Sequence, residues 1–88
     1  PTLSPFNAWV VLKGLETLDL RVRRQCDNAL EVARFLEGRV ERILYPGLAS
    51  HPQHNLALRQ MSAGGTILSF FVRDRAQAHG LLDALELI

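Results

Sequence analysis

Apolar residues dominate the first part of the chain. A helix is predicted to begin after Ser4, whose hydroxyl can accept a hydrogen bond from a free backbone N–H, with Pro5 at its first position. Gly14 is the expected stop. Apolar side chains surround nearly the whole helix, so we expect it to be buried on both sides. These side chains are Phe6, Ala8, Trp9, Val10, Val11 and Leu12.

A longer helix is predicted from about Asp19 to Leu36, ending at Gly38. Its apolar positions fall at i, i+4, i+7, i+8, i+11 and i+14, which form one continuous stripe. The stripe consists of Val22, Cys26, Ala29, Leu30, Ala33 and Leu36. Polar and charged residues occupy the opposite side, which we expect to be solvated.

The middle of the chain predicts a strand over Val40 to Tyr45 and a turn at Pro46-Gly47. A short helix should begin at Ser50, since Ser50 and Gln53 have the spacing of a capping box. Gly64-Gly65 should end it.

The last part of the chain predicts a second strand, Thr66 to Val72, which is apolar on both faces and therefore central and covered. Asp74 and Gln77 have the spacing of another capping box. The helix that follows carries an i, i+3, i+4, i+7 stripe of Ala78, Leu81, Leu82 and Leu85. The order α-α-β-α-β-α predicts an α/β or α+β layer fold.

Composition narrows the class of protein. The chain has 88 residues, ten Lys and Arg, and nine Asp and Glu, for a formal net charge of +1. This balance argues against a nucleic-acid partner, and no apolar run approaches the roughly 20 residues of a membrane helix. A single cysteine and no visible secretory signal favour a reducing, cytoplasmic setting.

The ends of the sequence suggest a fragment. The chain begins at Pro1 without an initiator Met and stops at the apolar pair Leu87-Ile88. A helix that is apolar on both sides also needs more protein than 88 residues supply. We therefore expect a segment of a larger protein, with a marginal core of its own.

Few residues suggest chemistry. His51 and His54 could share a metal, with Cys26 and His79 as distant further ligands, but surface or capping roles are favoured. Cys26 could be a nucleophile beside a base, but its place in the apolar stripe favours a core role. The sequence thus predicts no metal site.

The basic residues receive similar interpretations. Arg21, Arg23 and Arg24 form a cluster that fits a solvated or interface face better than a nucleic-acid site. Lys13, the only lysine, fits an ion pair or the helix dipole better than a Schiff base. Gly64-Gly65 precedes a strand rather than a helix, so it is interpreted as a turn and not as a phosphate cradle.

The order and spacing of three stretches of the chain match those of a known protein family. They are Leu3–Trp9, then Lys13–Leu18 with Leu20-Arg21 and Asn28-Ala29, then Tyr45–Leu48 with His51-Pro52; Gly64–Phe70 follows. Together they resemble the Cys/Met-metabolism family of pyridoxal-phosphate enzymes. That family includes cystathionine γ-synthase, cystathionine γ-lyase, methionine γ-lyase and O-succinylhomoserine sulfhydrylase. The Ser4–Trp9 segment is most similar to the last of these.

The resemblance implies a fold-type-I enzyme, usually a homotetramer, that performs transferase or lyase chemistry in transsulfuration and methionine biosynthesis. Residues 1–38 would form the end of the large domain and the long inter-domain helix. Residues 39–88 would form the first part of the C-terminal α/β domain. Further strands of that domain would cover Leu68 and Phe70.

The resemblance also implies what this chain lacks. The family's Schiff-base lysine and phosphate ligands belong to an earlier segment, and its carboxylate-binding arginine to a later one. Lys13 matches a position that is commonly Arg in the family. We therefore assign no catalytic, cofactor-binding or metal-binding residue here, and we expect the 88 residues alone to be inactive. A non-catalytic α/β interaction module remains the alternative.

Overall fold

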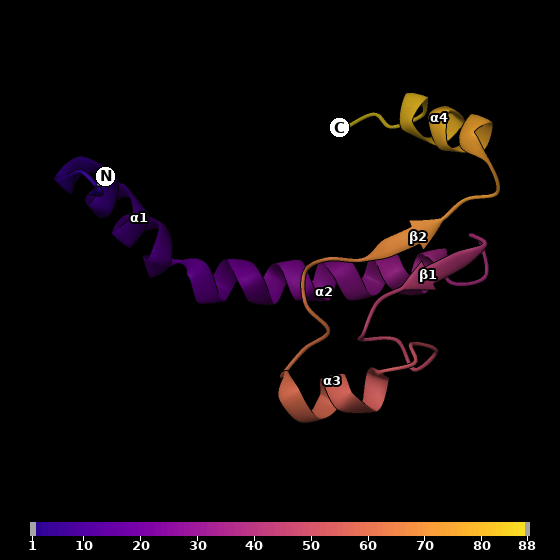
Figure 1. Cartoon of the computed structure of the whole chain (residues 1–88), viewed down its shortest axis with the longest axis horizontal. Helices are drawn as coiled ribbons and strands as arrows, with labels where there is room; N and C mark the ends of the chain where they lie inside the picture. Colours follow the sequence, from indigo (N-terminus) through magenta and orange to yellow (C-terminus); the bar gives the residue numbers. More distant parts are fainter. Residues whose placement is uncertain (1, 88) are drawn as a thin grey trace.

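The elements follow the predicted order α-α-β-α-β-α in the computed structural model, which describes residues 2–87 (Figure 1). Helix α1 runs over Pro5–Glu16 and α2 over Leu18–Leu36. Strand β1 is Arg42–Leu44, α3 is His54–Gln60, β2 is Ser69–Phe71 and α4 is Arg75–Asp83. No helix among these residues has the length and apolar character needed to cross a bilayer.

Helix α1 begins as predicted and ends later than predicted. The Ser4 hydroxyl accepts a hydrogen bond from the Asn7 amide at 3.2 Å, and Pro5 occupies the first turn. The prediction that Gly14 stops the helix is wrong, because Gly14 does not have the positive φ of a helix-terminating glycine. The helix continues to Glu16, and Thr17 separates it from α2.

Helix α2 is close to its predicted span, starting at Leu18 instead of Asp19. Only the middle of its stripe is buried: Cys26, Ala29 and Ala33. The Val22 end of the stripe is exposed. Gly38 follows the helix with a φ of +80°, a conformation that a glycine adopts without strain.

The two strands pair antiparallel in a small sheet, with Ile43 opposite Phe70. Both are shorter than the predicted spans, because ladder bonds form only where the two strands face each other. A further bond from the Glu41 amide to the Phe71 carbonyl, 3.1 Å long, continues the pairing by one residue. All three β2 residues are exposed within residues 2–87, so this segment does not itself cover the strand predicted to be central.

The predicted capping box at the start of α3 is wrong. The helix begins at His54, four residues later than expected, and Gln53 caps it without a side-chain hydrogen bond. The Ser50 hydroxyl instead donates to a Glu37 carboxylate oxygen at 2.7 Å. Ser50 therefore ties this loop to the end of α2, because an available carboxylate is a stronger acceptor for the hydroxyl than a neutral group.

The capping box of α4 is confirmed in a shifted form. An Asp74 carboxylate oxygen accepts from the Gln77 amide at 2.8 Å. The Gln77 side chain accepts from the amide of Arg73, one residue before the cap, also at 2.8 Å. The apolar stripe of α4 is largely exposed, with Leu82 61% accessible.

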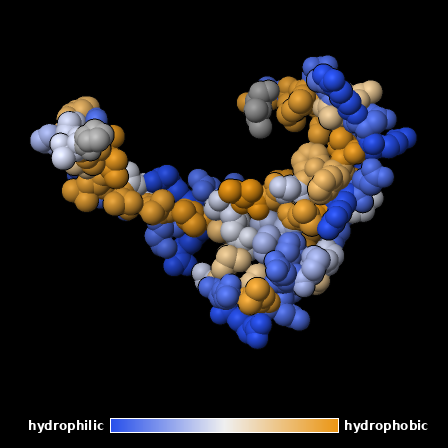
Figure 2. Space-filling model, viewed as in Figure 1, coloured by the Kyte–Doolittle hydropathy of each residue, from blue (hydrophilic) through white to orange (hydrophobic). Residues whose placement is uncertain are grey.

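The core is small and lies where the sheet and its loop meet the C-terminal half of α2. Ala29, Ala33, Tyr45 and Leu48 are buried together, and Leu30, Ile43 and Leu68 pack against them. The radius of gyration is 17.1 Å, against about 12 Å for a compact domain of this length. Figure 2 shows hydrophobic residues along α1, where Phe6 and Trp9 are more than half exposed. The segment therefore leaves broad apolar faces that its own residues do not cover.

Candidate functional site

A cavity of about 310 Å³ lies between α2 and α3. Helix α2 contributes Cys26, Asp27 and Leu30, and the turn after β1 contributes Tyr45, Pro46 and Gly47. The wall from α3 and its following loop consists of His54, Ala57, Leu58, Met61, Ser62, Ala63 and Gly64. The lining is mainly apolar.

The Tyr45 side chain contacts several of the elements that line the cavity. It is 1% exposed, and its hydroxyl donates to the Gly65 carbonyl at 2.9 Å. The Cys26 carbonyl of α2 lies 3.4 Å from the same oxygen as a longer second acceptor. One side chain thereby links β1, α2 and the loop that precedes β2.

Two glycines pack directly on this side chain. A Cβ added at Gly47 would lie 2.5 Å from Cε1 of the Tyr45 ring. A Cβ added at Gly64 would lie 2.7 Å from the backbone of Gly47 and 2.8 Å from the ring's Cζ. Gly65 adopts a φ of +91°. The Gly64-Gly65 pair is thus more than a turn: one glycine permits close packing and the other permits the left-handed conformation.

The environment of Tyr45 raises the pKa of its phenol above the ordinary value of 10.0. Burial is the largest cause, because it disfavours the phenolate. The negative charges that Cys26 and Asp27 can carry act in the same direction. Tyr45 therefore stays protonated and remains a hydrogen-bond donor through neutral pH.

The two histidines make local hydrogen bonds instead of meeting. His51 Nδ1 accepts from the Gln53 amide at 3.0 Å, whereas His54 Nδ1 lies 2.7 Å from the Pro46 carbonyl. A carbonyl can only accept, so His54 Nδ1 is the donor. Among residues 2–87 no three His, Cys, Asp or Glu side chains gather in a metal-binding arrangement.

Cys26 occupies the core position predicted for it, as a free thiol with 9% exposure. It lines the same cavity as His54. The described residues show no hydrogen bond between the two side chains. A nucleophile needs a base within hydrogen-bond reach, so the geometry supports the packing role.

The basic residues are engaged on the surface. Lys13 Nζ pairs with Glu16 at 2.8 Å, as the ion-pair interpretation predicted, and Arg23 Nε pairs with Asp19 at 2.9 Å. The Arg21 guanidinium bonds to the Thr17 hydroxyl and the Gly14 carbonyl. Arg21 and Arg23 therefore make their hydrogen bonds to residues of α1, α2 and the junction between them.

The residues of this segment do not fit a pyridoxal phosphate site. Such a site needs a lysine for the Schiff base and donors for a phosphate. Lys13 is exposed, pairs with Glu16 and does not line the cavity. Among the described residues no lysine or arginine lines the cavity. The cavity is therefore not assigned as the site of the cofactor that the resemblance implies.

Sequence reasoning missed the part played by Tyr45. A signal was present, because a tyrosine that ends an apolar strand before Pro46-Gly47 must find a partner for its hydroxyl once buried. The partner, Gly65, is 20 residues away, and only the folded chain brings them together.

The sequence comparisons cover the whole chain. Residues 1–88 match the family described as Cys/Met metabolism PLP-dependent enzyme. The chain is 50% identical over 91 residues to O-succinylhomoserine sulfhydrylase of Pseudomonas aeruginosa, with all of this chain and 23% of that protein covered. It is 47% identical over 77 residues to a probable cystathionine gamma-synthase of Herpetosiphon aurantiacus, covering 85% of this chain and 24% of that protein. The chain thus spans about a quarter of the length of these relatives.

The structural comparison gives the same result. The chain superposes on the O-acetylhomoserine sulfhydrylase of Wolinella succinogenes with a TM-score of 0.92 and 38% identity. The superposition covers 99% of this chain and 26% of the solved one, so the extended shape is that of a segment within a larger fold. Sequence and structure together show that the chain belongs to the Cys/Met-metabolism family of pyridoxal-phosphate-dependent enzymes.

Proposed function

We propose that this chain is one segment of an O-succinylhomoserine sulfhydrylase, an enzyme that replaces the γ-substituent of an activated homoserine ester with sulfur. The observation that carries the proposal is the 50% identity to such an enzyme along the entire chain. The product of this reaction class is homocysteine, a precursor of methionine. The protein is thus proposed to be a pyridoxal-phosphate-dependent transferase.

We further propose the domain division that the resemblance implies. Residues 1–38 belong to the end of the large domain and to the long inter-domain helix, and residues 39–88 to the first part of the C-terminal domain. The exposed Trp9 and Phe6 of α1 support this division, since apolar side chains of that size require a covering surface. The exposed β2 supports it at the other end, where further strands would cover Phe70.

The role of the segment in catalysis is architectural. Pyridoxal phosphate supplies an electron sink for carbanion chemistry when it is bound. The residues described here hold the small domain in place: α2 is its 19-residue support, and Tyr45 fixes the loops against that support. The 88 residues alone would have no activity. The proposed assembly is a cytoplasmic homotetramer that acts on a small-molecule substrate, without nucleic acid or membrane.

The test is an activity profile of the complete polypeptide with pyridoxal phosphate. O-Succinylhomoserine with sulfide should yield homocysteine faster than O-acetylhomoserine with sulfide does. Little product from either ester with sulfide would contradict the sulfhydrylase proposal. Native mass spectrometry on the same sample reports the assembly and the bound cofactor.

A second candidate is cystathionine γ-synthase, favoured by the 47% identity to the Herpetosiphon protein. Cystathionine γ-lyase and methionine γ-lyase activities complete the alternatives within the family. Cysteine in place of sulfide distinguishes the synthase, because the product is then cystathionine. Release of 2-oxobutyrate from cystathionine or methionine would identify a lyase. A complete polypeptide with no cofactor and no activity would instead favour a non-catalytic interaction module.

A further inference from the structure

Helices α1 and α2 meet at a single residue, Thr17, and their axes do not continue each other (Figure 1). Thr17 has a φ of −109° and a ψ of 9°, outside the helical range, and its amide bonds to the Leu15 carbonyl. No proline or glycine stands at this position. The sequence itself therefore supplies no strong helix breaker, and something else must hold the bend.

Arg21 reaches back across the bend. Its Nε donates to the Thr17 hydroxyl at 3.2 Å, and its Nη2 donates to the backbone carbonyl of Gly14 in the last turn of α1. The same residue's amide bonds to the Thr17 carbonyl at 3.0 Å, which starts the hydrogen-bond ladder of α2. One arginine thus touches the end of α1, the junction and the start of α2.

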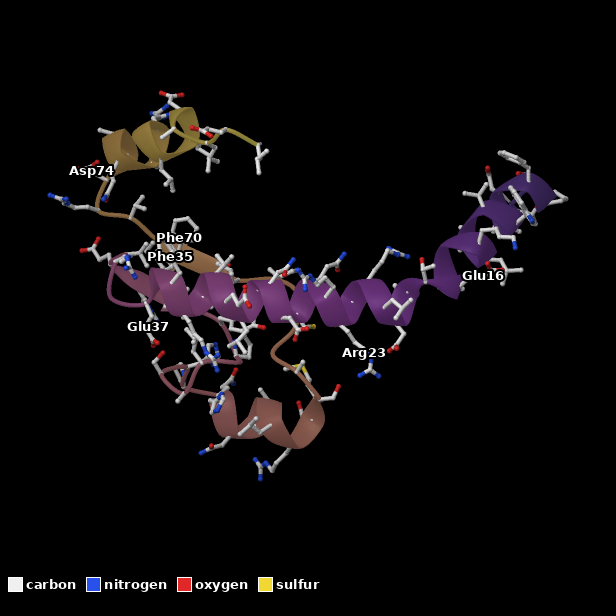
Figure 3. All side chains as sticks on the ribbon, turned by 180° about the vertical axis from the view of Figure 1, so that it is seen from behind. Glu16, Arg23, Phe35, Glu37, Phe70 and Asp74 are labelled. Carbon is white, nitrogen blue, oxygen red and sulfur yellow. The ribbon has the colours of Figure 1, made fainter. Side chains whose placement is uncertain are left out.

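The chemistry of the Arg21 contacts suits a side chain that holds two helices at a fixed angle. The last carbonyls of a helix lack partners within the helix, and they carry a partial negative charge. A guanidinium is planar, permanently charged and rich in donors, so it can serve the carbonyl and the hydroxyl together. The neighbouring Arg23 differs, because its bond to Asp19 stays within α2 (Figure 3).

We propose that Arg21 is a positioning residue that fixes the angle between α1 and α2, and thereby sets how the small domain closes on the cofactor domain. The proposal rests on the domain division above, in which α1 is anchored in the large domain and α2 carries the small one. A bend held by side-chain hydrogen bonds at one residue is a suitable hinge, since few contacts must change when it moves. In this proposal Arg21 acts through the geometry of the junction and not through contact with the substrate.

The test compares Arg21→Ala with Arg23→Ala in the complete holoenzyme. Substitutions at hinge residues often change kcat and KM together. We therefore expect Arg21→Ala to raise the KM for the amino-acid substrate about fivefold or more and to lower kcat. Arg23→Ala should leave both near the wild-type values. A mere loss of folded enzyme would lower the apparent kcat and leave KM unchanged, and that result would overturn the proposal.

Hydrogen–deuterium exchange supplies a readout that needs no activity. Amides of residues 14–21 should exchange faster in Arg21→Ala than in Arg23→Ala, with Arg21→Lys intermediate because an ammonium cannot match the planar fork. If Arg21→Ala fails to fold, Thr17→Val removes one of the two contacts and should produce a smaller change of the same kind. Equal exchange rates in the two alanine variants would overturn the proposal that Arg21 holds the junction between α1 and α2. An inactive wild-type enzyme would refute the proposed function. The exchange data would still show whether the Arg21 contacts stabilise the junction between α1 and α2.

Discussion

The Tyr45 hydroxyl lies 2.9 Å from the Gly65 carbonyl and donates a hydrogen bond to it. The two residues are 20 positions apart, and α3 lies between them in the chain. Their hydrogen bond holds the end of the segment that contains α3 against the core, because the Tyr45 ring itself packs beside Ala29 and Ala33 of α2. The stability of this half of the segment should therefore depend strongly on the tyrosine and on its glycine neighbours.

Tyr45→Phe should destabilise the complete protein by about 1 kcal/mol. The substitution keeps the ring in the core but removes the donor, which leaves the partly buried Gly65 carbonyl with one partner fewer. The free energy of unfolding from chemical denaturation measures the effect. An unchanged denaturation midpoint would show that water replaces the hydroxyl.

Gly64→Ala should be more damaging, by about 1–3 kcal/mol, because the new methyl group would collide with the Gly47 backbone and the Tyr45 ring. Gly80→Ala is the matched control. Gly80 lies within α4, and outside the backbone of its own helix and its chain neighbours no described atom comes within 4 Å of a Cβ there, so alanine should be neutral or stabilising. Comparing the thermal unfolding midpoints of the two variants separates the steric clash at Gly64 from the general effect of adding a methyl group.

Stability should fall in alkali partly through Tyr45. Its pKa is raised in the folded state, so the folded protein holds the phenolic proton more tightly than the unfolded chain does. The resulting stabilisation is complete below the ordinary value of 10.0 and is lost as the pH rises from there through the folded-state pKa. Denaturation midpoints between about pH 8 and about pH 11 should fall more steeply for the wild type than for Tyr45→Phe. Parallel curves would contradict this assignment.

Lys13→Ala should leave the complete enzyme able to bind pyridoxal phosphate and to turn over. Lys13 is exposed and already paired with Glu16 within this segment. Cofactor content by absorbance and kcat are the measurements. A variant that purifies without cofactor would show that the Schiff base forms in this segment after all.

Trp9→Ala should cost about 3–5 kcal/mol in the complete protein, because removal of a large covered side chain leaves a cavity. Within this segment Trp9 is 55% exposed and meets only one aromatic neighbour, Phe6, at 6.2 Å between ring centroids. The large cost therefore depends on the proposed large domain packing over α1. A chemical-denaturation difference below about 1 kcal/mol would show that Trp9 is not in a core.

Local chemistry determined much of this protein from the sequence. Ser4 and Asp74 start helices because their side chains satisfy backbone amides three residues away. The stripe from Cys26 to Ala33 is buried because its 3.6-residue period places it on one side of α2. The order of the elements followed from the same short-range patterns.

Only the tertiary structure decided the features that depend on distant partners. Ser50 failed to cap α3 because Glu37, 13 residues away, offered its hydroxyl a carboxylate. The strands are short because each pairs only where the other faces it. Likewise, Arg21 reaches Gly14 only once the chain bends at Thr17, and Tyr45 finds Gly65 only once α3 has formed. Periodicity and capping are local and can be derived from a sequence, whereas a hydrogen bond across a bend or a loop depends on where the fold places both of its ends.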